Sequence, residues 1–349
     1  MDDWEFCQES LQQVSRTFAR PIEMLREPLL QAVTCGYLLC RVADTVEDTA
    51  SLPLQDKDAL FATLLTTIDA STPPETFANA FARSRTGEGA DAELCRNLPR
   101  VMRVVRELPA PHQQILAQWV GEMTRGMGIY SHRRPREGVV NLLTLSDLER
   151  YCYFVAGTVG HMLTSLFAET LSLDAETSDA LRTTAEDFGL GLQLVNILKD
   201  LTDDWARGWC FVPQTLCAAE DLTPGMLFEP THRQAAHRAI APMFARADQA
   251  LEQAFEYCLS LPHDATDIRL FCLLPLWMAV ATLQHARGND AQLETGTPVK
   301  ITRAEVEWLI QDCVKRVGDN ASLRSGMQDL LAGQWRQAHG ATPKQSASA

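Results

Sequence analysis

Two short acidic clusters, far apart in the chain, hold the residues best suited to chemistry. The first is Asp44-Thr45-Val46-Glu47-Asp48, and the second runs from Asn196 to Asp204 with the sequence Asn-Ile-Leu-Lys-Asp-Leu-Thr-Asp-Asp. Both interrupt apolar stretches, where an unpaired carboxylate is costly to bury. We therefore expect each cluster to hold a cation.

On a helix, each cluster forms one column of oxygen ligands. Asp44 and Asp48 are four residues apart, with Glu47 beside them, and the second cluster repeats this step of four. Carboxylate oxygens are the ligands that Mg²⁺ prefers, and substrate phosphates commonly complete its coordination. Two facing columns would therefore clamp a diphosphate through Mg²⁺. The candidate metal ligands are Asp44, Glu47, Asp48, Asn196, Asp200, Asp203 and Asp204.

Zinc and di-iron sites fit the two clusters less well than a magnesium site does. Neither column contains His or Cys, which argues against zinc. A di-iron bundle needs paired Glu-x-x-His motifs, and the only match, Glu229-Pro230-Thr231-His232, contains a proline. One cluster alone would indicate a solvated helix face, but two clusters with the same spacing favour a ligand site.

The rest of the chain predicts the helices that position these columns. Apolar residues recur at helical spacing, and no segment alternates as a strand or repeats, so the predicted fold class is all-α. We expect one domain over residues 1–335 and a disordered polar tail over 336–349. The expected helices are 4–19, 28–49, 56–68, 91–107, 111–127, 145–171, 175–204, 231–261, 266–287 and 303–332. The expected loops are 71–74, 85–89, 132–139 and 207–213.

Composition narrows the class of protein. The 349 residues carry a net charge of −14, which argues against a nucleic-acid partner. The ten cysteines show no C-x-x-C spacing and are expected to be reduced thiols of a cytoplasmic protein. The acidic N-terminus does not resemble a signal peptide. The longest apolar run, 270–283, contains Pro275 and is typical of a buried core helix. We expect a soluble protein that could touch a membrane peripherally.

From about Ser15 to about Arg303, the motifs resemble those of the squalene/phytoene synthase family. The first acidic cluster matches the family's Asp-x-x-x-Asp motif, with Tyr37 and Arg41 upstream, and the second matches its Asn-Ile-x-Lys/Arg-Asp motif. Two further family motifs match Ser-Arg-Thr-Phe at 15–18 and Tyr-Cys-Tyr-Phe-Val-Ala-Gly-Thr-Val-Gly at 151–160. The resemblance implies an isoprenoid-synthase helical bundle with a central cavity, in which two prenyl diphosphates are joined head to head with Mg²⁺.

The resemblance also implies roles for individual residues. Tyr151 would act as an acid/base or carbocation-stabilising residue, whereas Arg41, Lys199 and Arg207 would bind diphosphate. The candidate catalytic residues are Tyr151, Arg41, Tyr37, Phe18, Lys199 and Arg207. The candidate substrate-binding residues are Ser15, Arg16, Thr17, Val155, Gly157, Gly160, Gln193 and Asn196. A core role for Tyr151 and pairing of Arg41 and Lys199 with neighbouring acids stay open as alternatives.

Four glycines leave the helix faces beside these motifs without side chains. Gly157 and Gly160 lie one turn apart, and Gly189 and Gly191 precede the second cluster. Glycine costs up to about 1 kcal/mol relative to alanine inside a helix, so something bulky is expected nearby. A prenyl tail and a closely packed neighbouring helix both meet that description.

The branch of the family is suggested by the C-terminal third. Residues 271–283 resemble the squalene branch, which joins two farnesyl diphosphates and reduces presqualene diphosphate with NADPH. The candidate cofactor residues are Phe271, Cys272, Lys300 and Arg303, the last two for the 2′-phosphate. The segment 298–301 resembles a nucleotide-holding stretch, and no Gly-x-Gly-x-x-Gly follows a strand, so an NADPH site would not be of Rossmann type.

One stretch points the other way. Residues 204–213 have the spacing of phytoene synthases, but Trp209 stands where their Arg-Arg-Gly-Arg run has its last arginine. We favour the squalene branch. The alternatives are a phytoene or dehydrosqualene synthase that needs no reductant, a non-catalytic assembly factor, and a lipid carrier. The expected partners are two farnesyl diphosphates and, for product release, a membrane surface; no oligomeric state is predicted.

Overall fold

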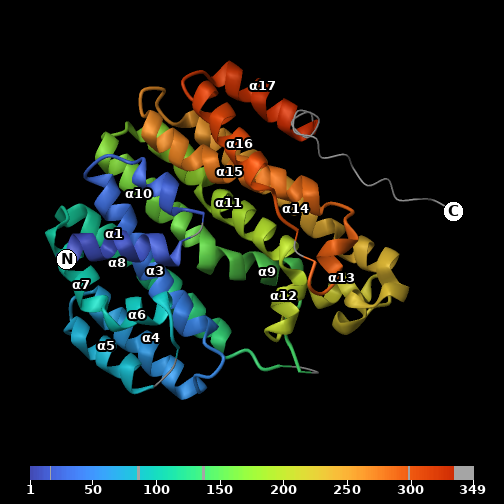
Figure 1. Cartoon of the computed structure of the whole chain (residues 1–349), viewed down its shortest axis with the longest axis horizontal. Coiled ribbons are helices and arrows are strands. Elements are labelled where there is room, and N and C mark those ends of the chain that lie inside the picture. Colours follow the sequence, from blue (N-terminus) through green and yellow to red (C-terminus); the bar gives the residue numbers. More distant parts are fainter. Residues whose placement is uncertain (16, 85–86, 136–137, 298, 334–349) are drawn as a thin grey trace.

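A computed structural model describes residues 1–15, 17–84, 87–135, 138–297 and 299–333. Helices account for nearly all of the regular structure in these ranges (Figure 1). The elements of the N-terminal half are α1 (Asp3–Val14), α2 (Ala19–Glu23), α3 (Leu29–Asp48), α4 (Leu54–Ile68), α5 (Pro74–Arg83), α6 (Ala90–Arg96), α7 (Leu98–Glu107), α8 (Ala110–Ser131), β1 (Val140–Asn141), α9 (Leu145–Cys152), η1 (Tyr153–Gly157) and α10 (Thr158–Leu171). The remaining elements are α11 (Ala175–Lys199), α12 (Leu201–Ala206), β2 (Trp209–Cys210), α13 (Gln214–Ala218), η2 (Pro224–Phe228), η3 (Pro230–His232), α14 (Arg233–Ser260), α15 (Thr266–Ala286), η4 (Asp290–Leu293), α16 (Arg303–Arg316) and α17 (Asn320–Leu331).

The helices surround α11, which runs through the middle of the bundle. It packs against α10, α14 and α15, while α3 packs against α8. In Figure 1, the blue and teal helices α1 to α8 lie on one side and the orange and red helices α14 to α17 on the other, with α9 to α11 between them. The predicted all-α fold class is confirmed. The arrangement brings the C-terminal end of α3 and the junction of α11 with α12 to one cavity.

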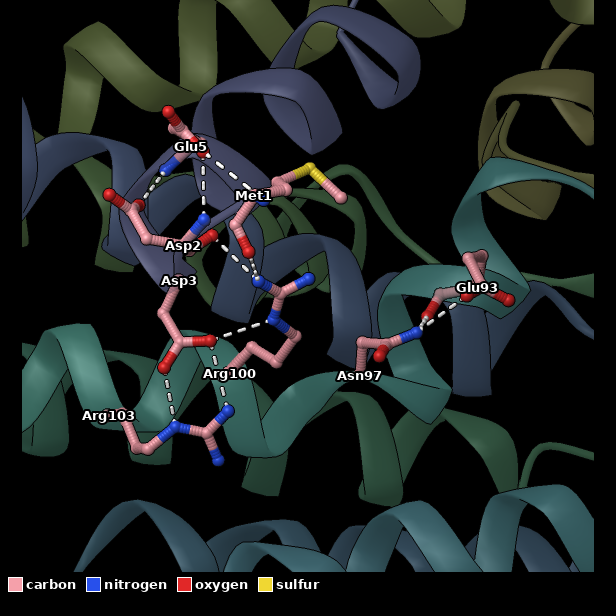
Figure 2. A network of polar contacts seen from close by, with 8 residues as sticks. All are labelled: Met1, Asp2, Asp3, Glu5, Glu93, Asn97, Arg100 and Arg103. Carbon is pink, nitrogen blue, oxygen red and sulfur yellow. Dashed lines mark hydrogen bonds and ion pairs between the residues drawn. The ribbon is translucent and has the colours of Figure 1, made fainter.

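The N-terminal helix is fixed to α7 by charged groups. Asp2 and Glu5 form a capping box, and Arg100 and Arg103 converge on Asp3 with Nε–Oδ distances of 2.8 and 2.5 Å (Figure 2). Hydrogen bonds from these two guanidinium groups hold the pKa of Asp3 well below its usual range. This attachment orients the chain that continues towards Phe18.

Several predicted helices are interrupted where a cap intervenes. The helix expected over 4–19 ends at Val14, because Ser15 adopts an extended conformation and its hydroxyl accepts the N–H of Phe18 at 3.0 Å. The helix expected over 91–107 is two helices, with Pro99 in the first turn of α7, where its missing N–H costs nothing. The helix expected over 303–332 divides at Asp319, whose carboxylate caps α17.

Further local features lie outside the sequence prediction. Helix α5 was not predicted, and the helix expected over 175–204 divides at Asp200 into α11 and α12. The prediction that no segment forms a strand is wrong. Two strands of two residues each, β1 and β2, form a parallel pair in which Val140 pairs with Trp209. Within the helix expected over 145–171, residues Tyr153–Gly157 form a π-helical turn. Such turns often occur at functional sites.

Burial agrees with the expectations for the cysteines and for the apolar run. All ten cysteines lie within the described ranges and are buried without a disulfide. Residues 270–283 fall in α15, a core helix that contains Pro275. Helices Leu29–Asp48 and Thr266–Ala286 are long and apolar enough to cross a membrane, but most of each is buried inside the fold. The predicted disordered tail over 336–349, together with Arg16 and Pro298, lies outside the described residues.

Candidate active site

A cavity of about 660 Å³ opens between α3, α11, α12 and α15. Carboxylates and arginines line one part of its wall, and aliphatic and aromatic side chains line the rest. The polar lining residues are Tyr37, Arg41, Asp44, Glu47, Asp48, Lys57, Gln193, Asn196, Asp200, Asp204 and Arg207. This division suits a ligand with a charged head and a long apolar tail.

Both acidic columns contribute to this one wall. Asp44, Glu47 and Asp48 come from α3, whereas Asn196 and Asp200 come from the end of α11. Burial raises the pKa of Asp44 to about 7 and that of Asp204 to about 6. It also raises the pKa values of Glu47 and Asp48, where neighbouring carboxylates add to the effect on Glu47. The site therefore concentrates carboxylates whose ionisation needs a positive charge.

Arg207 connects the two columns electrostatically. Its guanidinium donates to Asp204, and its charge opposes the burial that raises the pKa of Asp48. On α3, Arg41 donates to the Tyr37 hydroxyl at 2.9 Å, and its nitrogens lie 3.9 Å from both Asp44 and Asp91. Arg207 is thus paired with the second column and near enough to the first to influence it, whereas Arg41 is paired with the first column alone. Both arginines also supply the donors that a diphosphate would need.

Two predicted polar residues lie away from the cavity. Asp203 is exposed and does not line it, because α12 turns that side chain outward while Asp204 is buried. Lys199 likewise does not line the cavity, and its ammonium group donates to the adjacent Asp200. This is the pairing with a neighbouring acid that the sequence left open as an alternative to diphosphate binding. Neither side chain joins the group that the sequence suggested.

Two further charged residues at the site, Lys57 and Asp91, were not predicted from the sequence. Lys57 lines the cavity, donates to the Glu47 carbonyl oxygen at the end of α3, and has a pKa lowered by burial. Asp91 at the start of α6 forms the second ion pair of Arg41. Both come from helices without a motif. Only the packing of α4 and α6 against α3 places them here.

An aromatic group lies beside the carboxylates. Tyr151 is buried, and burial, followed by the negative charge of Glu47, raises the pKa of its phenol well above its usual range. Its ring centroid lies 5.1 Å from those of Tyr130 and Phe211 and 6.0 Å from that of Trp209. The phenol is therefore neutral and packed among rings at the polar end of the cavity.

The remaining predicted substrate residues divide in the same way. Phe18, Val155 and Gly160 line the cavity, as does Gln193, whereas Ser15, Thr17 and Gly157 do not. The rest of the cavity lining consists of apolar and aromatic side chains. These include Val33, Met123, Met162, Leu163, Phe167, Phe188, Tyr257, Phe271, Cys272 and Pro275.

The glycines serve close helix packing. A Cβ added at Gly160 would lie 2.0 Å from the Ala185 carbonyl oxygen, and one at Gly189 would lie 2.2 Å from that of Ala156. Helix α11 thus meets α10 and η1 with backbone against backbone. The sequence left two explanations open for these glycines, a prenyl tail and a closely packed helix. The structure places a neighbouring helix against Gly160 and Gly189.

The residues expected to bind NADPH do not form one group. Phe271 and Cys272 are buried in the cavity wall, whereas Lys300 and Arg303 are exposed and do not line the cavity.

The chain resembles known proteins of one family over most of its length. The model of the squalene/phytoene synthase family matches residues 11–305, and the chain belongs to this family.

Its relatives include squalene synthases. The chain is 27% identical to squalene synthase ERG9 of Gibberella zeae over 89% of this chain and 64% of the relative. It is 30% identical to squalene synthase of Eremothecium gossypii over 88% and 69%, respectively. The chain therefore spans less than two thirds of the length of several of these relatives, including the one from Gibberella zeae.

Solved structures agree on the fold. The complex of TcSQS with the ligand E5700 has a TM-score of 0.77 and 27% identity, and the match covers 95% of this chain and 92% of that one. A dehydrosqualene synthase in complex with a ligand has a TM-score of 0.66 at 20% identity, covering 93% and 97%. The second likeness shows the shared helical fold alone.

Proposed function

We propose that this chain is a squalene synthase, which condenses two farnesyl diphosphates through presqualene diphosphate and reduces the product to squalene. The observation that carries the proposal is the cavity itself: two acidic columns form one part of its wall, and apolar side chains form the rest. The squalene synthases among its relatives support the same substrate.

The carboxylates fit Mg²⁺ ions that are shared with a substrate. One buried oxygen of Glu47 has no hydrogen-bond partner, and ionisation of Asp44 and Asp204 is suppressed by burial. Within the described ranges, no three acidic, His or Cys side chains converge on one metal position. Mg²⁺ commonly binds one or two carboxylates together with phosphate oxygens of a substrate. Asp44, Asp48, Asp200 and Asp204, with Asn196, would hold the ions, which offset the charge of a departing diphosphate when bound.

The remaining residues bind, orient and exclude water. Arg41 and Arg207 present guanidinium donors to the diphosphate oxygens, while the apolar wall surrounds the prenyl tail and keeps water from the allylic cation. Tyr151 retains its proton on Oη because its pKa is raised. A neutral phenol is a weak base, so the released diphosphate takes the proton that is lost as the new carbon–carbon bond forms.

The residues expected to hold NADPH lie apart from one another. Phe271 and Cys272 lie in the cavity wall, but the basic pair expected at the 2′-phosphate lies outside it, so the four do not fit NADPH as one site. The same observation favours the second candidate, a dehydrosqualene or phytoene synthase that uses no reductant.

A product assay decides between these functions. Purified protein is incubated with labelled farnesyl or geranylgeranyl diphosphate and Mg²⁺, with and without NADPH, and the products are analysed by mass spectrometry. We expect squalene from farnesyl diphosphate with NADPH and presqualene diphosphate as an intermediate. A product that NADPH does not change would replace squalene synthase by the second candidate. Binding without diphosphate release would point to a lipid carrier or an assembly factor.

A further inference from the structure

A short strand turns two aromatic side chains towards the diphosphate end of the cavity. After Arg207 the chain reverses at Gly208, whose φ of +86° lies in the left-handed region that favours glycine. Strand β2 then pairs with β1, and the Gly208 carbonyl oxygen accepts the N–H of Val140 at 2.8 Å. Side chains alternate along an extended segment, so Trp209 and Phe211 share one face. Both line the cavity, whereas the Cys210 thiol between them bonds to the Val212 carbonyl oxygen.

The two rings form a flat stack against Tyr151. The ring centroids of Trp209 and Phe211 are 5.2 Å apart and the ring planes meet at 12°. The ring centroid of Tyr151 lies 6.0 Å from that of Trp209 and 5.1 Å from that of Phe211. Tyr151 is close enough to Glu47 and Asp48 for their charges to raise its pKa. Tyr151, Trp209 and Phe211 line the same cavity as these carboxylates, so the stack lies beside the groups that would hold a diphosphate.

Trp209 is the unusual member of the stack. In this stretch the spacing resembles that of phytoene synthases, in which an arginine would occupy position 209. A guanidinium there would repel a cation, whereas an indole presents the aromatic face that attracts cations most strongly. The stacked Phe211 and the β1–β2 pair hold the indole in place.

From this arrangement we infer that Trp209, supported by Phe211, faces the allylic cation and determines whether it forms hydrocarbon or is captured by water. The inference rests on the proposed function. When the carbon–oxygen bond breaks, its electron pair leaves with the diphosphate and the carbon becomes positive. The indole face stabilises that charge without forming a bond. Capture by water would form a new carbon–oxygen bond and release a proton, giving an alcohol.

Ligand binding tests the charge preference without turnover. Affinities are measured by calorimetry with Mg²⁺ for two probes, an azaprenyl diphosphate with a protonated amine at the cationic carbon and the uncharged-tail analogue farnesyl thiodiphosphate. We expect Trp209→Leu to weaken the first probe about tenfold and the second less than about twofold. Trp209→Phe keeps a ring and should lie between Trp209→Leu and the native protein. Equal losses for both probes, or none for either, would overturn the inference; retained thiodiphosphate affinity shows that the variant is folded.

Product analysis provides the second test. The native protein and the Leu variant turn over farnesyl diphosphate in ¹⁸O-labelled water, and alcohols carrying the label are compared with hydrocarbons. We expect the labelled alcohol fraction to rise at least about fivefold in Trp209→Leu and much less in Trp209→Phe. An unchanged partition argues that the stack only packs the wall. If the native protein converts no substrate, the proposed function fails, while the two-probe comparison still reports on Trp209.

Discussion

Asp44 and Asp204 stay protonated up to a higher pH than ordinary aspartates, because they are buried beside other carboxylates. Their pKa values of about 7 and about 6 in the folded protein exceed the ordinary value of 3.8. At pH values between the ordinary pKa and these raised pKa values, the folded state binds more protons than the unfolded state. The free energy of unfolding therefore falls as pH rises through this range. Mg²⁺ needs ionised ligands and displaces those protons. The two effects make metal binding and stability depend on the same groups.

We expect Mg²⁺ to raise the melting temperature more at about pH 8 than at about pH 5. Without metal, the pH-dependent loss of stability over this range should be smaller in Asp44→Asn than in the native protein, because one suppressed ionisation is gone. Thermal unfolding of both proteins with and without Mg²⁺ checks this. A magnesium effect of equal size at both pH values would show that the buried carboxylates are not its ligands.

Adjacent carboxylates on α12 offer a matched pair of substitutions. Asp204 is buried in the cavity wall and Asp203 is exposed outside it. Asp204→Asn should lower kcat/KM about 100-fold or more, because it removes a carboxylate that would hold the Mg²⁺ ions offsetting the diphosphate charge. Asp203→Asn should change it less than about threefold. Steady-state kinetics at saturating Mg²⁺ measure both, and a comparable loss in the two variants would contradict the assignment of Asp203 to the surface.

Sequence reasoning succeeded at this scale where spacing alone selects a face. A step of four placed Asp44 with Asp48 and Asn196 with Asp200, and the structure brings both pairs to one cavity. It could not find Lys57 or Asp91, because their relation to α3 is set by the packing of other helices. Asp203 lies three residues after Asp200 and next to Asp204, but in α12 its side chain is exposed while that of Asp204 is buried.

At the scale of elements, the wall of the cavity depends on how closely α10 and η1 approach α11. A methyl group at Gly160 would meet the Ala185 backbone at 2.0 Å, where no side chain can move aside. We expect Gly160→Ala to lower the free energy of unfolding by about 1–3 kcal/mol. Gly128→Ala is the control: its Cβ would meet only Phe61 at 3.8 Å, so it should be neutral or stabilise α8 by up to about 1 kcal/mol. Chemical denaturation compares the two, and tolerance of both would mean that α11 can shift freely.

Element boundaries were harder to predict than element types. The apolar periodicity found the long helices α3, α8, α14 and α15, since burial of one face or of the whole helix decides them. The periodicity did not show the helix breaks at Ser15 and Asp319. At each break a single side chain accepts a backbone N–H that another helical turn would otherwise have bonded. The two-residue strands β1 and β2 are too short to show any alternation, and their pairing joins segments that only the fold brings together.

At the scale of the whole molecule, the cavity is built from segments that span most of the chain, from Phe18 to Pro275. A ligand that contacts both its polar and its apolar parts should therefore stabilise the fold as a unit. We expect Mg²⁺ with farnesyl thiodiphosphate to raise the melting temperature by several degrees, since about 2.7 kcal/mol is gained at a hundredfold excess over Kd. Inorganic diphosphate with Mg²⁺ engages only the carboxylate wall and should give a clearly smaller shift, and farnesol alone almost none. Differential scanning calorimetry compares the three ligands under identical conditions. An equal shift with inorganic diphosphate would mean that the prenyl tail lies outside the apolar part of the cavity, and the farnesyl-length substrate would then lose its structural support.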